Sequence, residues 1–266
     1  MSKKRNKAVK KSRDKFIAFI DSDAYATKKW IFNGIKILKK KPNIGIVSGP
    51  ELPLSKQKSW TYIISLAHKS ILLSGSKVFS KNLKKEIFCE QTSSCNMIME
   101  RKVFKLVGGM DEKIYIGEDK DLCDKIRKFF KILYSPKVVV YHKVRDFIPF
   151  ILQRFSYGTG IIDIVKNNKK IGFNNFQYFI PMFVVLYLIL LPLSILNNFL
   201  TSFFLIIFIA LNSIMLIESL KITLNPIKFF KIFLIFYINI IFFGLGSILF
   251  FLKEKNIKKI YTFRAN

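Results

Sequence analysis

The stretch Lys15-Phe-Ile-Ala-Phe-Ile20 is followed directly by Asp21-Ser-Asp23. A short continuous apolar run that ends abruptly in acidic residues is typical of a buried parallel strand whose end reaches a polar site. In open α/β sheets, ligands bind beyond the carboxyl ends of the strands. We therefore expect Asp21 and Asp23 to lie at a ligand site, where two carboxylates can meet a hard divalent cation.

The flanking segments complete an alternating pattern of helices and strands. Residues 3–12 are compatible with a helix, residues 28–40 predict a second helix, and residues 44–47 predict a strand. In the second helix the residues expected on one inward face are Trp30, Ile31, Ile35 and Leu38. Helix, strand, helix, strand is typical of an α/β domain.

The pattern continues less regularly towards residue 145. The further elements that we expect are a helix over about 60–73, a strand over 96–99, a turn at 108–109, a helix over 118–130 and a strand over 137–141. In the helix over 118–130, Leu122, Ile126 and Phe129 are expected to face inward. The sequence therefore predicts one α/β domain over residues 1–145.

The remainder of the chain is strongly apolar. Residues 146–177 predict an interfacial amphipathic helix and a linker, and residues 178–266 predict a transmembrane region. The apolar spans are approximately 178–196, 202–217 and 230–252. A crossing helix needs about 20 residues, so the second span is marginal. The basic loop after the second span and the basic tail both favour the cytoplasm, which conflicts with three full crossings. One span, in the first place the last with its Gly244-Leu-Gly246 break, would then be re-entrant or interfacial, and the topology stays open.

The net charge of +28 suggests attraction to anionic lipid rather than to nucleic acid. The basic residues are scattered, and the sequence contains no arginine-rich arm or zinc finger, so we expect no nucleic-acid partner. The three cysteines, Cys89, Cys95 and Cys123, have no metal-ligand spacing and are expected to be reduced and structural.

Acidic residues are scarce and unevenly placed. Of 17 acids, six lie within residues 111–124, namely Asp111, Glu112, Glu118, Asp119, Asp121 and Asp124. Acids at a helix start are often partners of the helix dipole, which accounts for one or two of them. The whole cluster indicates a functional site.

Several blocks in this order resemble the family 2 glycosyltransferases of the GT-A fold, from about Arg5 to Gly160. The blocks are Arg5-Asn6, Asp21-Ser-Asp23, Val47-Ser-Gly-Pro50, the segment from Asn96 through Arg101 to Gly108-Gly-Met-Asp-Glu112, and Gly117-Glu-Asp-Lys-Asp-Leu122 with Arg127. The apolar tail resembles that of membrane-anchored succinoglycan-type members, which make exported polysaccharides. The resemblance implies an α/β fold class: an incomplete, Rossmann-like GT-A catalytic domain followed by an all-α membrane region of about three hydrophobic helices.

The resemblance also implies roles for individual residues. Asp23, assisted by Asp21, would hold Mg²⁺ or Mn²⁺ against the diphosphate of a nucleotide-sugar donor. Asp119 would be the general base, with Glu118 beside it. The donor-binding residues would be Arg5, Asn6 and Asp21, and the acceptor-binding residues would be Asp111, Glu118, Gln153 and Arg154.

Two departures from the family pattern modify this reading. Processive relatives carry Gln-x-x-Arg-Trp near the membrane, whereas this chain has Gln153-Arg-Phe-Ser-Tyr157, which favours single transfer. The family's first strands have no counterpart before Asp21. We therefore expect an N-terminally truncated chain that alone binds sugar nucleotide poorly. Such a chain would arise from a split or wrongly started gene, or would be completed by a separate polypeptide supplying the missing strands.

The sequence thus favours an inverting glycosyltransferase that transfers a sugar to a lipid-linked or polysaccharide acceptor in cell-surface glycan synthesis. It would be a multi-pass protein of the plasma membrane with a cytoplasmic catalytic domain. Two alternatives remain: an inactive or split-gene fragment of such an enzyme, and a non-catalytic basic membrane protein.

Overall fold

The computed structural model describes residues 1–54, 59–74, 83–114, 116–167 and 179–252. The chain divides into two compact units. The first comprises residues 1–57 and 76–144, and the second comprises residues 58–75 and 145–266.

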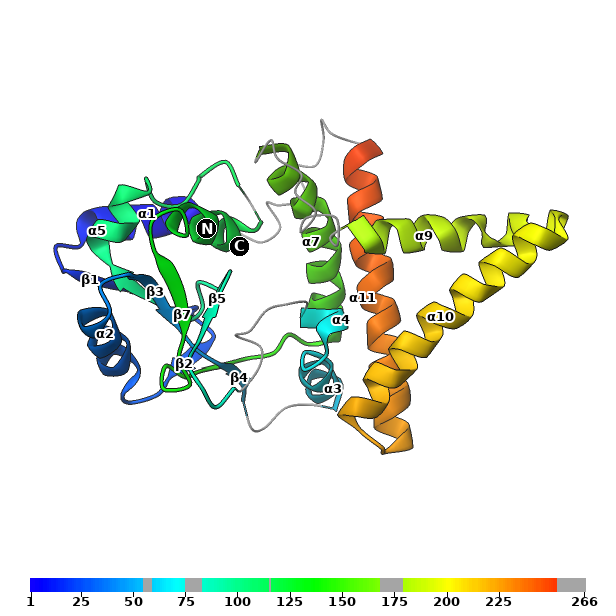
Figure 1. The fold of residues 1–266 in the computed structure, drawn as a ribbon, viewed down its shortest axis with the longest axis horizontal. Helices are drawn as coiled ribbons and strands as arrows, with labels where there is room; N and C mark the ends of the chain where they lie inside the picture. Colours follow the sequence, from blue (N-terminus) through cyan, green and yellow to red (C-terminus); the bar gives the residue numbers. More distant parts are fainter. Residues whose placement is uncertain (55–58, 75–82, 115, 168–178, 253–266) are drawn as a thin grey trace. The chain divides into compact units, whose positions relative to one another are not determined.

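The first unit is built on a five-stranded mixed sheet (Figure 1). Its strands, in spatial order, are β1 (Phe16–Phe19), β6 (Met97–Glu100), β3 (Ile44–Ser48), β7 (Lys131–Tyr134) and β5 (Ile87–Cys89). Only β3 and β7 run parallel, and the other neighbours are antiparallel. A smaller sheet has the order β2 (Ala24–Ala26), β8 (Val140–His142) and β4 (Glu51–Pro53).

Helices pack on both faces of the larger sheet, as an α/β architecture requires. One face carries α1 (Ser2–Lys11), α5 (Arg101–Leu106) and α6 (Glu118–Ile126), and their buried side chains share one core with β1, β3, β6 and β7. The other face carries α2 (Trp30–Lys40), whose Trp30 and Leu38 pack against residues of β3, β6 and β7. The expected α/β class is therefore present.

Buried Asn96 connects three parts of the first unit. Its Oδ1 atom accepts a hydrogen bond of 2.8 Å from Trp30 Nε1, and its Nδ2 atom donates to the Val138 carbonyl at 2.8 Å. A buried amide that is fully hydrogen-bonded specifies how its neighbours meet. Asn96 therefore fixes α2 and the segment leading into β8 against the start of β6.

The structure corrects several details of the sequence prediction in this unit. The strand after Lys15 is not a buried parallel strand, because β1 lies at the sheet edge and pairs antiparallel with β6. Ile31 and Phe129 are exposed rather than inward-facing. The helix from Glu118 ends at Ile126. The strand expected over 137–141 begins only at Val140, and β7 was not predicted.

The second unit is entirely helical in its described part. It contains α3 (Ser59–Ala67), α4 (Ile71–Ser74), α7 (Phe147–Asn167), α9 (Ile180–Leu190), the 3₁₀ helix η3 (Leu191–Leu196), α10 (Asn198–Ile222) and α11 (Pro226–Leu252). The single helix expected over about 60–73 is therefore two helices, α3 and α4. Side-chain oxygens cap the N-termini of the two longest helices, α10 and α11. Asn197 Oδ1 accepts hydrogen bonds from the amides of Phe199 and Leu200, and Asn225 Oδ1 accepts one from the amide of Lys228.

Close contacts at glycines hold α11 against its neighbours. A side-chain carbon on Gly158 of α7 would lie 1.9 Å from the Phe243 carbonyl oxygen, and one on Gly246 would lie 2.1 Å from that of Phe155. Ser247 Oγ also donates to the Gly158 carbonyl at 3.1 Å. The sequence suggested that Gly244 and Gly246 break the last span, but α11 continues through both glycines. They let α7 and α9 approach a continuous helix.

Two described helices are long and apolar enough to cross a membrane, α10 over 198–222 and the segment 226–250 of α11. The first expected span, over about 178–196, is shorter than a crossing helix needs. Its apolar helical stretch covers only residues 180–194, where α9 passes into η3. About three membrane helices were expected, and the described residues supply two of sufficient length. In the most apolar window of α10 only 6% of the residues are buried, against 39% in α11.

Candidate active site

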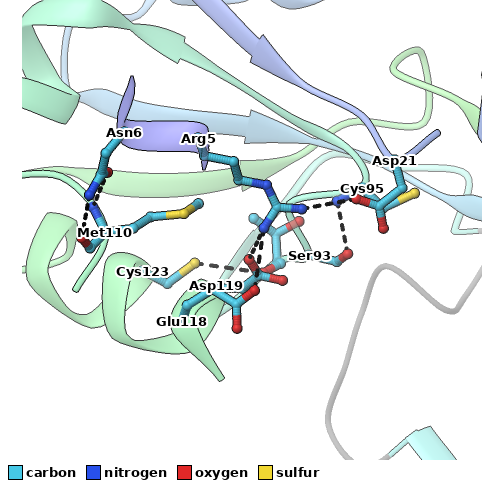
Figure 2. Close-up of polar contacts among 10 residues, drawn as sticks. Arg5, Asn6, Asp21, Ser93, Cys95, Met110, Glu118, Asp119 and Cys123 are labelled. Atoms are coloured by element: carbon cyan, nitrogen blue, oxygen red, sulfur yellow. Dashed lines mark hydrogen bonds and ion pairs between the residues drawn. The ribbon is translucent and has the colours of Figure 1, made fainter. Parts of the chain in front are cut away.

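Arg5 joins the two acidic groups that the sequence singled out (Figure 2). Its Nη2 atom lies 2.9 Å from Asp21 Oδ1, at the turn after β1. Its Nη1 atom lies 3.4 Å from Glu118 Oε1 and 3.6 Å from Asp119 Oδ1, at the start of α6. Carboxylates separated by almost a hundred residues in the chain therefore surround one guanidinium.

Asn6, the next residue on α1, fixes the position of that helix. Its amide nitrogen donates to the Met110 carbonyl at 2.8 Å, and its amide oxygen accepts from the Met110 amide at 3.1 Å. The same nitrogen lies 3.1 Å from Glu112 Oε1. The chain reaches Met110 through Gly108 and Gly109, whose φ angles of 77° and 73° favour glycine. This clamp holds Arg5 in its place between the acids.

Glu118 and Asp119 occupy the first turn of α6. The helix begins at Gly117, which has a φ of 88° and so lies in the left-handed region that glycine tolerates. Negative charge at a helix start interacts favourably with the helix dipole. The side chains remain partly exposed, at 15% for Glu118 and 28% for Asp119.

Burial shifts the titration of this acidic pair. It raises the pKa of Glu118, with the neighbouring charge of Asp119 acting in the same direction. Burial likewise raises the pKa of Asp119, against the opposing effect of the Arg5 guanidinium and of hydrogen bonds from Ser94. Asp119 Oδ1 is a buried atom without a hydrogen bond from any described residue. A carboxylate with a raised pKa is a stronger base than an ordinary aspartate or glutamate.

A second group of side chains lies around Asp21. A carboxylate oxygen of Asp21, the sulfur of Cys95 and a ring nitrogen of His142 all lie within 4.8 Å of one another. Asp23 Oδ1 is 3.3 Å from His142 Nε2. The pairing of β2 with β8 causes this proximity, because it sets Ala24, directly after Asp23, opposite His142.

The oxygen ligands that a divalent cation needs are available here. Asp21 and Asp23 lie on one turn, and their side chains are 35% and 47% exposed, so a cation and an anionic ligand can reach them from solvent. Carboxylates in a partly open site suit Mg²⁺ or Mn²⁺, which keep water and substrate oxygens in their coordination shell. The donor set therefore fits the expected cofactor.

One known protein family covers most of the chain. Residues 16–221 match the model of the family described as "Glycosyl transferase family group 2". The chain belongs to the family 2 glycosyltransferases. The matched range includes both acidic groups of the site and extends into α10, whereas Arg5 and Asn6 precede it. No curated protein matches the chain. Membership in family 2 supports glycosyl transfer from a nucleotide-sugar donor to an acceptor.

The structure brings together Arg5, Asp21, Glu118 and Asp119, with Asp23 on the same turn as Asp21. Asn6 is engaged with Met110 and Glu112. Asp111 Oδ1 accepts a hydrogen bond from the Lys113 amide at 2.8 Å, which shapes the loop before α6. The donor role of Asn6 and the acceptor role of Asp111 stay predictions.

Gln153 and Arg154 lie in the second unit, on α7. The Arg154 guanidinium lies over the rings of Phe150 and Tyr157, at 5.0 and 4.8 Å from their centres. Its Nη2 atom donates to Gln153 Oε1 at 2.8 Å, and Gln153 Nε2 lies 3.0 Å from Tyr157 Oη. The two residues thus form one aromatic-lined polar cluster. Their acceptor-binding role stays a prediction.

Sequence reasoning missed Cys95 as a member of the site. Cys89, Cys95 and Cys123 are all free, as expected. Cys95, however, lies against Asp21 and His142, which are 74 and 47 residues away in the chain. Ligand spacing along the sequence could not reveal this group. The one available signal was the position of His142 directly after the strand expected over 137–141.

Proposed function

We propose that the protein is an inverting glycosyltransferase that uses Asp119 as its general base. The observation that carries this proposal is the ion-pair network in which Arg5 contacts Asp21, Glu118 and Asp119. It supports a single site that offers carboxylates both for a cation-bound diphosphate and for an incoming hydroxyl.

In the proposed reaction the acceptor hydroxyl attacks the anomeric carbon of the donor sugar. Its proton passes to an oxygen of Asp119 as the new carbon–oxygen bond forms. The bond between the anomeric carbon and the diphosphate breaks on the opposite side, and the nucleoside diphosphate leaves. One direct displacement inverts the anomeric centre. A positioned base contributes about 10²–10⁴-fold to the rate.

Asp21 and Asp23 would hold Mg²⁺ or Mn²⁺. When bound, the cation neutralises negative charge on the leaving diphosphate. Arg5, which already contacts Asp21, supplies a fixed positive charge at the same place. Glu118 lies beside Asp119 and orients the acceptor hydroxyl in this scheme.

Membrane attachment is a second part of the proposal. The exposed apolar surface of α10 supports a chain that works at a lipid bilayer. A membrane-bound transferase is suited to a lipid-linked or growing glycan acceptor, and a cytoplasmic catalytic unit would meet nucleotide sugars there.

The test is sugar transfer by the full chain in its native membranes, where any separate polypeptide that completes the donor site is present, with a panel of nucleotide sugars and an endogenous lipid acceptor fraction. We expect metal-dependent transfer that Asp119→Asn lowers by about 10²-fold or more. Asp14→Asn, an exposed acid outside the site, is the matched control and should retain activity. Near-normal turnover in Asp119→Asn would refute the assignment of the base.

A further inference from the structure

The cysteine next to the aspartates points to a metal preference that carboxylates alone would not give. Asp21, Cys95 and His142 come from three separate places in the first unit: the turn after β1, the residue pair before β6, and the end of β8. Their ligand atoms are within 4.8 Å of one another. A carboxylate, a thiol and an imidazole together are the ligand types of zinc-like cations.

We propose that Asp21, Cys95 and His142 form a site for a thiophilic divalent cation such as Zn²⁺. Bonds of about 2.0–2.3 Å to zinc set tetrahedral ligands roughly 3.5 Å apart, so no pair of these atoms needs to approach by more than about 1.3 Å. Cys95 is buried, whereas the Asp21 and His142 side chains are partly exposed. The sulfur therefore forms the floor of the site, and the fourth position faces solvent.

The surroundings support the three ligands. Asp23 Oδ1 lies 3.3 Å from His142 Nε2. With the cation on Nδ1, Asp23 would hold the imidazole ring as outer carboxylates do behind metal-bound histidines. The Cys95 amide donates to Ser93 Oγ at 3.0 Å, and the adjacent Asn96 is bound on both sides by Trp30 and Val138. These bonds fix the backbone that carries the sulfur.

The proposal has a consequence for the transferase site. Mg²⁺ prefers oxygen ligands and does not recruit the thiol, whereas a zinc-like cation does. Both cations would use Asp21, so the two modes of binding exclude each other. Binding of the thiophilic cation releases the thiol proton of Cys95 to solvent. The site itself does not depend on sugar transfer, so its test is separate from that of the proposed function.

The experiment titrates the purified full chain, in detergent and with a phosphine reductant, with Co²⁺ in place of Zn²⁺. We expect one equivalent of Co²⁺ to produce a thiolate-to-cobalt charge-transfer band in the near ultraviolet. The band should disappear in Cys95→Ser and persist in Cys89→Ser, the matched control. Absence of the band in the unaltered chain, or its survival in Cys95→Ser, would overturn the proposal.

A second variant keeps the test decisive if Cys95→Ser does not fold. His142→Asn should retain the band but weaken Co²⁺ binding by at least about tenfold. Unchanged Co²⁺ affinity in His142→Asn would count against the site. A parallel titration with Mn²⁺, followed by the resonance of the free ion, separates this site from the carboxylate site, because Cys95→Ser, which lacks the thiol ligand, should bind Mn²⁺ as well as the unaltered chain does.

Discussion

At the scale of single residues, Arg5 is the cation that compensates the negative charge of the acidic site. Two unit charges 4 Å apart interact by about 4 kcal/mol at an effective dielectric constant of 20, so three carboxylates facing one another repel strongly. The Arg5 side chain is only 13% exposed and contacts all three. A bound cation would also neutralise the negative charge of Asp21, as Arg5 does.

The raised pKa of the acidic pair predicts how activity depends on pH. A general base acts only when it is deprotonated, and burial raises the pKa of both Asp119 and Glu118. We therefore expect kcat/KM to fall on acidification through an inflection clearly above the ordinary aspartate value of about 4. The inflection belongs to the pair rather than to one residue. A profile that stays flat down to pH of about 4 would contradict this prediction.

Stability should show the opposite dependence. Because the pKa of Asp119 is raised in the folded state, the folded chain binds more protons than the unfolded chain between the two pKa values. The contribution of Asp119 to folding is thus fully present below its unfolded pKa and is lost as pH rises through its folded pKa. Thermal unfolding across pH should therefore show a smaller loss of stability on the alkaline side in Asp119→Asn than in the unaltered chain.

At the scale of elements, the packing of α7 on α11 depends on glycine. The two helices approach so closely that backbone carbonyls lie where side-chain carbons of Gly158 and Gly246 would be. A backbone atom cannot move aside as a flexible side chain can. Any larger residue at these positions must push α7 and α11 apart. The Gln153–Arg154 cluster, which lies on α7, would then move with that helix.

We expect Gly158→Ala to destabilise the helical unit by about 1–3 kcal/mol, the usual cost of overpacking a close contact. Ser156→Ala, on the same helix, is the control, because its hydroxyl bonds only to the preceding turn at the Leu152 carbonyl. The measurement is loss of helical circular dichroism in mixed micelles with increasing denaturing detergent. Equal midpoints for the two variants would mean that the helices do not pack as closely as described.

At the scale of the whole molecule, α10 exposes a large apolar surface that is unfavourable in water. It exposes large apolar side chains on all sides, among them Phe199, Ile206 and Ile209. A helix that is hydrophobic all round is buried in protein or in lipid. The described part of the chain covers little of it, which favours lipid.

Ile209, near the middle of α10 and 55% exposed, gives the sharpest test of insertion. An arginine at the centre of a crossing helix costs about 2.5–3.5 kcal/mol. We expect Ile209→Arg to reduce the fraction of chain that resists extraction from membranes by alkaline carbonate, whereas Ile209→Leu should not. If Ile209→Arg remains fully membrane-embedded, α10 does not cross the bilayer in the proposed way.

Local sequence patterns were sufficient to predict strands and helices wherever an apolar pattern ends at a clear polar boundary. Residues 16–19, 30–40 and 44–48 follow that rule, because their side-chain pattern and their flanking polar residues act locally. The sequence also determined both acidic groups, since 17 acids among 266 residues make a cluster conspicuous.

Strand direction, helix burial and contacts between distant residues could not be predicted from those local patterns. Strand direction depends on the partner, so β1 pairs antiparallel with β6 although its composition suggested a parallel strand. Burial of a helix face depends on what covers it, so Ile31 and Phe129 are exposed. The meeting of Cys95 with Asp21 and His142 depends on strand pairing between distant segments. Contacts of this kind are set by the packing of the whole unit, and no short stretch of sequence carries them.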